Sequence, residues 1–241
     1  MSIVLATVAI CFALFHAVSN ALVGGLGTSK PGTTPRAHML RRIAGLALFG
    51  IVPAMVAATA LPHGLAGVGL GLGDPLRAAG AVSILGLIAM PILWQATSQT
   101  KLQAQYPQIR VQEWDRNLYA ASSLTWAAYL LGYEFMFRGF LLFALIEPLG
   151  MWPAIWLNVA LYVAVHADKD SQEVIACVPM GVLFCALALW TGAIWAPFLL
   201  HVIIALTSET GAIVQRPDTD RWAILRSPHT YGSHHGRKEP G

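Results

Sequence analysis

Seven long apolar runs constrain the fold of this 241-residue chain more than any other feature. They cover about residues 2–24, 43–62, 77–97, 118–146, 151–166, 173–190 and 193–210. A membrane-spanning helix needs about 20 apolar residues to cross roughly 30 Å of hydrocarbon, and its backbone satisfies its own hydrogen bonds there. The runs therefore predict an all-α, polytopic transmembrane helix bundle of about seven spans, of which the fifth is short.

The composition supports a membrane protein and excludes a nucleic-acid partner. Only 11% of the residues are charged and 56% are hydrophobic, whereas soluble domains contain roughly 25% charged residues. Lys and Arg outnumber Asp and Glu by only 15 to 12, and the basic residues are spread over several loops. We expect residues 1–215 to form one transmembrane domain with the lipid bilayer as its solvent, and residues 216–241 to form a disordered cytoplasmic tail.

The distribution of basic residues predicts the orientation, because loops rich in Lys and Arg stay in the cytoplasm. With seven spans, 13 of the 15 Lys and Arg residues fall on one side, Arg77 falls on the other, and Arg138 lies within a span. This split places the N-terminus outside and the C-terminus in the cytoplasm. A cleaved signal peptide is the main alternative for residues 1–24, but that segment lacks a basic start and its removal would put the Arg-rich loop outside.

An acid and a base lie four residues apart within the fourth apolar run. Glu134 and Arg138 are its only charged side chains between Leu118 and Ile146, and at this spacing they share one helix face and can pair. A charge at the centre of a bilayer costs on the order of 3 kcal/mol, so both should face the bundle interior or a wet cavity. Taken alone, the pair fits a structural ion pair as well as a functional site.

Two histidines in neighbouring apolar runs favour a reaction centre. His166 ends the fifth run and His201 lies within the seventh. A single histidine in such a run is more often a packing residue, but imidazoles titrate near neutrality and can activate water or bind metals. Two histidines, a glutamate and an arginine on three neighbouring helices indicate that these side chains act together.

At these residues the chain resembles the CPBP intramembrane proteases, a family that includes CAAX prenyl proteases and bacteriocin-processing enzymes. The family motifs are Glu-Glu-x3-Arg, Phe-x3-His and His-x3-Asn, and their counterparts here are YEFMFRG (133–139), YVAVH (162–166) and TGAIWAPFLLH (191–201) followed by Ala205. The resemblance covers about residues 118–210. It implies an integral protein of a bacterial inner membrane that cuts a peptide bond in a membrane protein or lipidated peptide.

The chain departs from the family pattern at three motif positions. Tyr133 replaces the first glutamate, which the family uses to activate water, and Ala205 replaces the asparagine. Tyr162 in place of phenylalanine is a milder change. A phenol with a pKa of about 10 is a poor base at neutral pH, although it can donate a hydrogen bond. Alanine cannot stabilise an oxyanion.

Two chemistries fit the remaining residues. Glu134 and a histidine could activate water, with Arg138 orienting Glu134, or His166 and His201 could hold a metal ion, with zinc as the candidate. The two histidines lie on separate helices without HExxH spacing, so the sequence itself does not establish a metal site.

Three functions stay open at this point: an endopeptidase with a modified active site, an inactive family member that binds a membrane protein or lipidated peptide, and a transporter. The transporter is the weakest, because no inverted repeat is visible. Convergence of Glu134, His166 and His201 on one cavity would favour the endopeptidase. Tyr133 facing both histidines, with Glu134 turned wholly to Arg138, would favour the inactive binder.

Overall fold

The computed structural model describes residues 1–25, 32–166 and 171–216, so the expected tail lies outside the described residues beyond Arg216. The helical elements are α1 Ser2–Leu22, α2 Pro35–Leu46, η1 Ala47–Ile51, α3 Val52–Ala60, η2 Ala66–Val68, α4 Pro75–Ala96, α5 Thr100–Gln105, α6 Arg116–Glu134, η3 Phe135–Leu141, α7 Leu142–Leu149, α8 Met151–Ala164, α9 Ser171–Thr191 and α10 Trp195–Gln215. Elements η1 and η3 are π-helical and η2 is a 3₁₀ turn. No strand occurs in the described ranges, so the expected all-α bundle is confirmed.

Six helical segments among the described residues are long and apolar enough to cross a membrane: Ser2–Leu22, Pro35–Ala60, Pro75–Ala96, Arg116–Leu149, Val174–Thr191 and Trp195–Gln215. The chain is therefore an integral membrane protein. The expected fifth span, 151–166, is the exception. It forms the 14-residue helix α8, which is about 21 Å long and too short to cross the hydrocarbon. The helix ends at Ala164, shortly before the polar sequence that begins at His166.

Sequence signals at the helix starts explain where three of the spans begin. The side chain of Thr34 accepts a hydrogen bond from the backbone N–H of Ala37, and Asp74 accepts one from Arg77. Asp115 accepts a bond from Leu118 at 2.8 Å. These side chains satisfy N–H groups that have no partner in the first turn of a helix. In α2 and α4 the capping residue is followed by proline, which is compatible with the first helical position.

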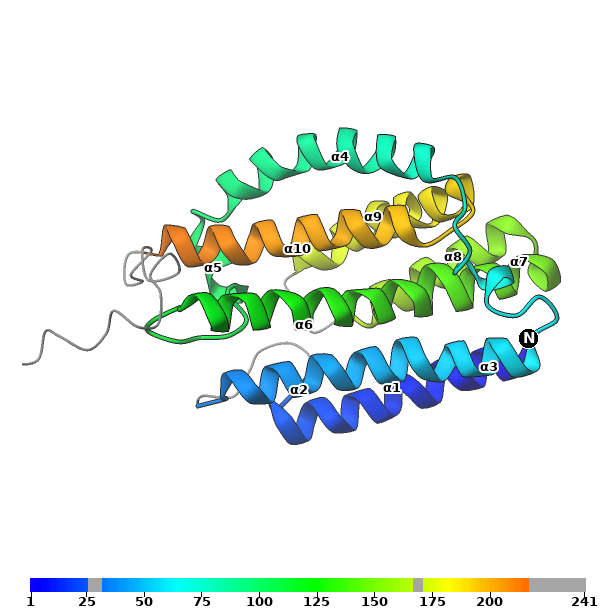
Figure 1. Cartoon of the computed structure of the whole chain (residues 1–241), viewed down its shortest axis with the longest axis horizontal. Coiled ribbons are helices and arrows are strands. Elements are labelled where there is room, and N and C mark those ends of the chain that lie inside the picture. The colour runs from blue at the N-terminus through cyan, green and yellow to red at the C-terminus, as the bar shows by residue number, and fades with distance from the viewer. Residues whose placement is uncertain (26–31, 167–170, 217–241) are drawn as a thin grey trace, which may run out of the picture.

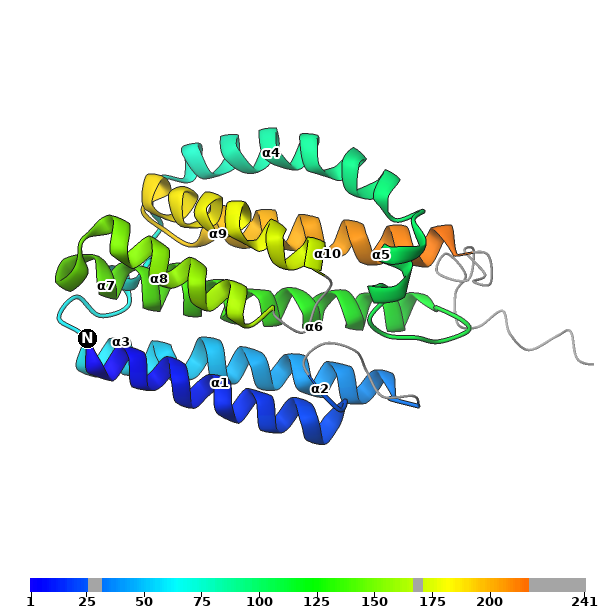
Figure 2. The same cartoon turned by 180° about the vertical axis from the view of Figure 1, so that it is seen from behind.

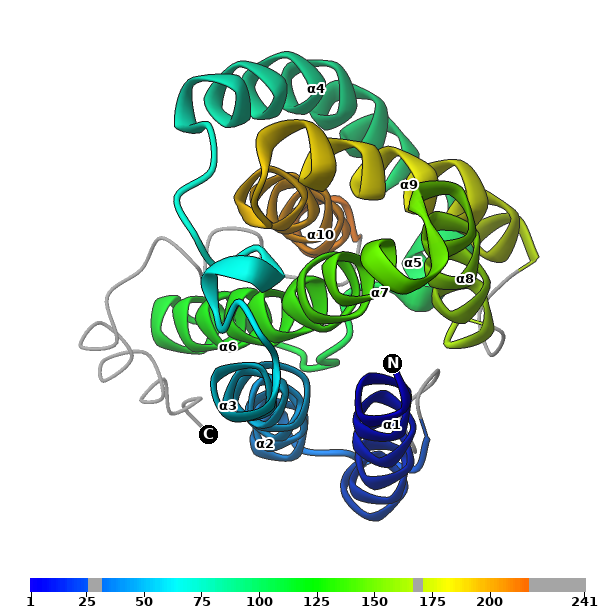
Figure 3. The same cartoon turned by 90° about the vertical axis from the view of Figure 1, so that its right-hand side faces the viewer.

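Helix α6, continued by η3 and α7, runs through the middle of the bundle (Figure 1). Helices α1, α2 and α3 lie on one side of it, and α10 with α4 lies on the other (Figures 1 and 3). Figure 2 shows α8 ending and α9 beginning near the middle of the bundle's length. The end of α8 and the start of α9 therefore lie at a depth at which α6 and α10 are continuous.

Apart from Arg77 and the buried Arg138, the basic residues of the described ranges lie toward one end of the bundle. The starts of α2 and α6, helix α5 and the end of α10 all lie at the left of Figure 1, and they carry Arg36, Arg116, Lys101 and Arg216. Arg77 lies at the start of α4, at the opposite end. The separation agrees with the expected loop assignment, while Lys30, Lys169 and the basic residues after position 220 lie outside the described ranges.

Two glycines allow close packing around the central helix. A Cβ atom on Gly132 would meet the Leu46 Cα and the Gly50 nitrogen at 3.1 Å. A Cβ on Gly139 would meet the Val68 carbonyl oxygen at 2.7 Å and the Phe135 ring at 2.6 Å. Small residues at such positions let helices approach closely in membranes, where packing drives association.

A buried polar network ties α2, α6 and α10 to the segment before α6. The guanidinium of Arg42 donates to the Ser122 carbonyl and hydroxyl oxygens, each at 2.9 Å, and to Gln108 Oε1 at 3.0 Å. The backbone N–H of Gln108 donates to Glu209 Oε2 at 3.0 Å. The Arg42 guanidinium also lies 4.7 Å from the centre of the Trp126 ring. We call Arg42, Gln108, Ser122, Trp126 and Glu209 the end network.

Candidate active site

The central helix changes its winding where the charged motif begins. Helix α6 ends at Glu134, and the π-helix η3 follows from Phe135 to Leu141, carrying Arg138. Every residue of η3 is buried, as are Tyr133 and Glu134. π-Helical turns are rare and occur frequently at functional sites, because they redirect side chains within a continuous helix.

Glu134 joins the central helix to α10. Its Oε1 atom lies 2.6 Å from Nδ1 of His201, and Oε2 lies 3.6 Å from Nε of Arg138. A carboxylate oxygen only accepts, so the Nδ1–H of His201 donates this bond and Nε2 is the unprotonated nitrogen of the neutral ring. Glu134 is completely buried, whereas the side chain of His201 is 17% exposed. Glu134 therefore contacts the partly exposed His201 from the protein interior.

Arg138 is completely buried and packs among aromatic rings. Its guanidinium carbon lies 4.3 Å from the ring centre of Tyr162 and 5.3 Å from that of Phe184. Its guanidinium nitrogens make no hydrogen bond to another described residue. The aromatic faces and the nearby Glu134 carboxylate are thus what compensates this charge in the interior.

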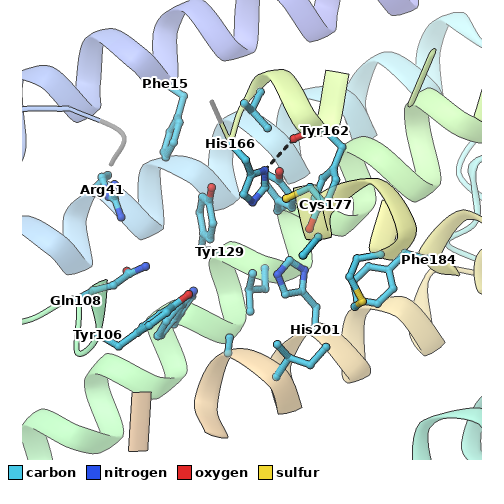
Figure 4. A pocket seen from close by; sticks show the side chains of 18 of the residues that line it. Phe15, Arg41, Tyr106, Gln108, Tyr129, Tyr162, His166, Cys177, Phe184 and His201 are labelled. Atoms are coloured by element: carbon cyan, nitrogen blue, oxygen red, sulfur yellow. Dashed lines mark hydrogen bonds between the residues drawn. The ribbon is translucent and has the colours of Figure 1, made fainter. Parts of the chain in front are cut away.

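His166 is held just beyond the end of α8. Its Nδ1 lies 2.8 Å from the carbonyl oxygen of Tyr162, as the dashed line in Figure 4 marks. Since a carbonyl only accepts, Nδ1 carries the hydrogen, and Nε2 is again the basic nitrogen. The Tyr162 ring stacks at a tilt on the imidazole, with centres 4.6 Å apart.

Tyr133 contacts both imidazoles. Its ring centre lies 6.3 Å from that of His166 and 6.0 Å from that of His201, and the planes meet at 83° and 79°. The Tyr133 hydroxyl is buried and has no hydrogen-bond partner among the described residues. Consecutive residues of a helix point to different faces, yet Tyr133 and Glu134 both approach His201 from α6.

The site borders a cavity of about 240 Å³ (Figure 4). His166, His201, Tyr133, Tyr162 and Ala205 all line it, whereas Glu134 and Arg138 do not. Further wall residues come from α1, α2 and α9, and from the segment between α5 and α6. The cavity thus combines two histidines with mainly aromatic and aliphatic walls, which is typical of sites that bind small or extended ligands.

The expected site residues do not all contact one another directly. Glu134 contacts Arg138 and His201 directly, and His166 approaches them through the Tyr133 ring. Ala205 ends in a methyl group at the cavity wall, so α10 presents no polar side chain there. The outcome combines features of both alternatives drawn from the sequence: Glu134 is shared between Arg138 and His201, and Tyr133 faces both histidines.

Among the described residues, the arrangement of donor atoms does not fit a metal ion. In the described part of the chain, no group of three or more His, Cys, Asp or Glu side chains comes close enough to hold one. The Glu134 oxygen also lies at hydrogen-bond distance from His201 Nδ1, so these two groups satisfy each other. Zinc needs at least three protein ligands in a catalytic site.

Asn158 was missed by sequence reasoning. It is fully buried on α8, its amide donates to the Phe137 carbonyl oxygen at 2.6 Å, and its Oδ1 accepts from the thiol of Cys185 at 3.3 Å. Phe137 lies within η3, so Asn158 supports the π-helix from a neighbouring helix. A single polar residue in the apolar sequence WLNVALY was the available signal.

Comparison with known proteins gives one match. The model of the Rce1-like family, described as type II CAAX prenyl endopeptidase Rce1-like, matches residues 116–207. The match begins with α6 and extends through most of α10, so it includes every motif residue of the site. No curated protein and no solved structure matches the chain.

Proposed function

We propose that this chain, in which residues 116–207 form an Rce1-like domain of the type II CAAX prenyl endopeptidase family, is an intramembrane endopeptidase with a modified active site. Its substrate is a membrane-associated or lipidated protein, cut within the cavity. The observation that carries the proposal is the 2.6 Å contact between Glu134 Oε1 and His201 Nδ1 at the wall of that cavity.

The Glu134–His201 pair can replace the missing glutamate as the group that activates water. A buried carboxylate bonded to Nδ1–H fixes the ring and its tautomer and stabilises the imidazolium that forms when Nε2 takes a proton. His201 is then the general base and Glu134 its orienting partner. This division of labour agrees with their burial, because only the histidine reaches the cavity.

The reaction follows from these positions. Nε2 of His201 removes a proton from water as the water oxygen bonds to the scissile carbonyl carbon, which creates a tetrahedral oxyanion. When the C–N bond breaks, the imidazolium returns the proton to the leaving amine, so the products are a carboxylic acid and an amine. His166, with its basic nitrogen on the same cavity, holds the water or the substrate N–H.

Arg138 is a positioning residue in this proposal. It lies outside the cavity wall and next to Glu134, so it keeps the carboxylate ionised and turned toward His201. Removing one partner of a buried ion pair leaves an uncompensated charge, which costs about 3–5 kcal/mol. Arg138 therefore affects both folding and the orientation of the base.

The walls of the cavity suggest how the substrate enters. Tyr106 and Gln108 line the cavity and belong to the segment before α6, at the end of the bundle where the basic residues gather. We assign this end to the cytoplasm, with the N-terminus on the opposite side, because basic segments remain cytoplasmic. The peptide would then be cut near the cytoplasmic side of the membrane.

An inactive, peptide-binding role is the second candidate, and a specific observation favours it. Tyr133 and Ala205 occupy the two motif positions on the cavity wall, where the related proteases carry polar groups, and Glu134 does not reach that wall. Such a protein would hold a membrane peptide in the cavity and release it uncut.

A comparison of new protein termini in membranes separates these functions. The chain and the variants His201→Ala, His166→Ala and Glu134→Ala are produced in the same cells, and new N-termini of membrane proteins are quantified by mass spectrometry. We expect cleavage products that disappear with His201→Ala and Glu134→Ala. The matched controls are His16→Ala and Glu147→Gln, whose side chains are exposed on α1 and α7.

Two outcomes would decide against the protease. One is the same set of termini for the native chain and every variant. The other is capture of an intact membrane peptide by photo-crosslinking in the cavity, without any product, which would establish the binding role instead.

A further inference from the structure

The buried hydroxyl of Tyr133 calls for a physical explanation. A buried hydroxyl without a partner destabilises the folded state, and phenylalanine at the same position would avoid that cost while keeping the ring. The surroundings of the ring are apolar or aromatic: Phe49, Tyr129 and Phe137 have ring centres within 6.2 Å of that of Tyr133. Packing therefore accounts for an aromatic ring at this position and not for its hydroxyl.

The position of Tyr133 relates this hydroxyl to the proposed reaction. Tyr133 lines the cavity beside the two histidines and contacts each imidazole edge-on. In the neutral form of each histidine Nε2 is unprotonated, because Nδ1 donates to Glu134 or to the Tyr162 carbonyl. In that form these nitrogens can accept a proton but cannot donate one. A phenol differs from them in offering an O–H donor.

Hydrolysis needs such a donor. Negative charge develops on the carbonyl oxygen as water attacks, and a preorganised hydrogen-bond donor at that oxygen is a large source of catalysis. Position 205, one helical turn after His201, supplies only a methyl group on the same wall. With no donor from α10 at this position, a side chain from α6 can supply it.

We propose that the hydroxyl of Tyr133 donates a hydrogen bond to the oxyanion of the tetrahedral intermediate, beside the general base His201. This role rests on the proposed endopeptidase function and names a further catalytic residue for it. The phenol stays protonated throughout: its O–H stabilises the charge on the oxygen, while His201 alone takes and returns the proton. Tyrosine at this position thus compensates for the short side chain at 205.

The direct test is the variant Tyr133→Phe in lipid nanodiscs, with a peptide that spans a cleavage site found in the comparison of termini. We expect kcat to fall by roughly 10²–10³-fold, the loss typical of one oxyanion donor, with little change in KM. The thermal midpoint should not fall, because the hydroxyl has no partner to lose. A purely structural tyrosine would instead lower stability and leave kcat unchanged.

A matched control uses a hydroxyl that does have a partner. The Tyr119 hydroxyl lies 2.7 Å from Thr210 Oγ1, and neither residue lines the cavity. Tyr119→Phe should lower the thermal midpoint without changing kcat, which is the reverse of the pattern expected for Tyr133→Phe.

An inhibitor series gives a readout besides turnover. A phosphinic analogue of the cleaved peptide carries a tetrahedral anionic centre, whereas its reduced-amide analogue does not. Tyr133→Phe should weaken binding of the phosphinic compound at least tenfold and leave binding of the reduced amide unchanged. Equal kcat for Tyr133→Phe and the native chain would overturn the role of Tyr133 while leaving the protease intact. Absence of cleavage by the native chain in the comparison of termini would overturn both proposals.

Discussion

Two buried polar clusters lie along α10, and they differ in how their charges are satisfied. In the end network, Arg42 donates three hydrogen bonds, and Glu209 accepts one from the Gln108 backbone, so only Arg42 Nε and Glu209 Oε1 lack a partner among the described residues. In the candidate active site, the guanidinium nitrogens of Arg138 donate none, and the Tyr133 hydroxyl has no partner. Both arginines are almost completely buried, at 1% and 0% exposure.

The difference indicates separate tasks. An arginine that donates several hydrogen bonds between elements holds them in one arrangement, because each bond would be lost if the helices moved apart. Polar groups left unsatisfied lower stability and persist in native structures where they serve a function. The end network joins segments of the bundle, and its charged residues Arg42 and Glu209 do not line the cavity. The candidate active site, by contrast, places a histidine on the cavity wall. Four predictions test this contrast.

The largest effect is expected from replacing the carboxylate of each cluster by an amide. Glu134→Gln should reduce kcat by about 10³–10⁴-fold, because a neutral amide neither stabilises the His201 imidazolium nor enforces its tautomer. Glu209→Gln should retain most of the turnover per folded molecule, since Gln108 can still donate to the amide oxygen. Both are measured on the same peptide in nanodiscs, after normalisation to folded protein.

Equal losses of turnover in these two variants would remove the distinction between the clusters. A Glu134→Gln enzyme with native turnover would show that His201 does not depend on its carboxylate partner.

The next effect concerns stability. Arg42→Met removes three hydrogen bonds and one of the two arginines, Arg42 and Arg110, whose charges act on the buried Glu209, which should lower the free energy of unfolding by about 3–5 kcal/mol. Unfolding by SDS titration, followed by tryptophan fluorescence, measures this change. The exposed Arg36→Met serves as the control on the same helix, with a change near zero. An unchanged free energy of unfolding for Arg42→Met would mean that the end network does not stabilise the bundle.

The sequence predicts these two clusters to different degrees. Glu134 and Arg138 are one helical turn apart, so their proximity follows from local geometry alone. Arg42, Gln108 and Glu209 belong to distant segments, and only the packing of α2 against α6 and α10 brings them together. Periodicity and hydropathy describe single helices and carry no information on such contacts.

Three features of the candidate site also follow from tertiary structure. The hydrogen bond between Glu134 and His201 depends on α10 packing against α6, and the π-helical winding from Phe135 has no distinct residue pattern. The fifth apolar run has the composition of a span, yet its helix is 14 residues long and ends near the middle of the bundle's length. The helices, by contrast, were predictable because apolar length and the capping residues Asp74 and Asp115 act locally.

A smaller effect is expected from replacing Asn158, which supports the site from a neighbouring helix. Asn158→Leu keeps a side chain of similar size but removes the side-chain donor of the Phe137 carbonyl, which still accepts from the backbone N–H of Leu142, so the loss should be about 0.5–1.5 kcal/mol. Because Phe137 precedes Arg138 in η3, turnover should also fall, by roughly tenfold, as the carboxylate shifts. Thermal unfolding and kcat are measured together. Cys185→Ala is the matched control, since it removes the weak thiol contact to the same Asn158 and keeps the bond from Asn158 to Phe137. Loss of stability with native kcat would assign Asn158 to packing alone.

The smallest effect is expected from removing one of the several hydrogen bonds that Arg42 makes in the end network. Ser122→Ala removes one acceptor of Arg42, while the Ser122 backbone carbonyl, also at 2.9 Å, continues to accept from the same nitrogen. The loss should therefore be about 0.5–1.5 kcal/mol, well below that for Arg42→Met, with no change in kcat. In the double variant with Arg42→Met, removing the hydroxyl should cost nothing further, because its donor is already gone. Additive losses would mean that Ser122 stabilises α6 independently of Arg42, and the end network would then be a set of separate contacts.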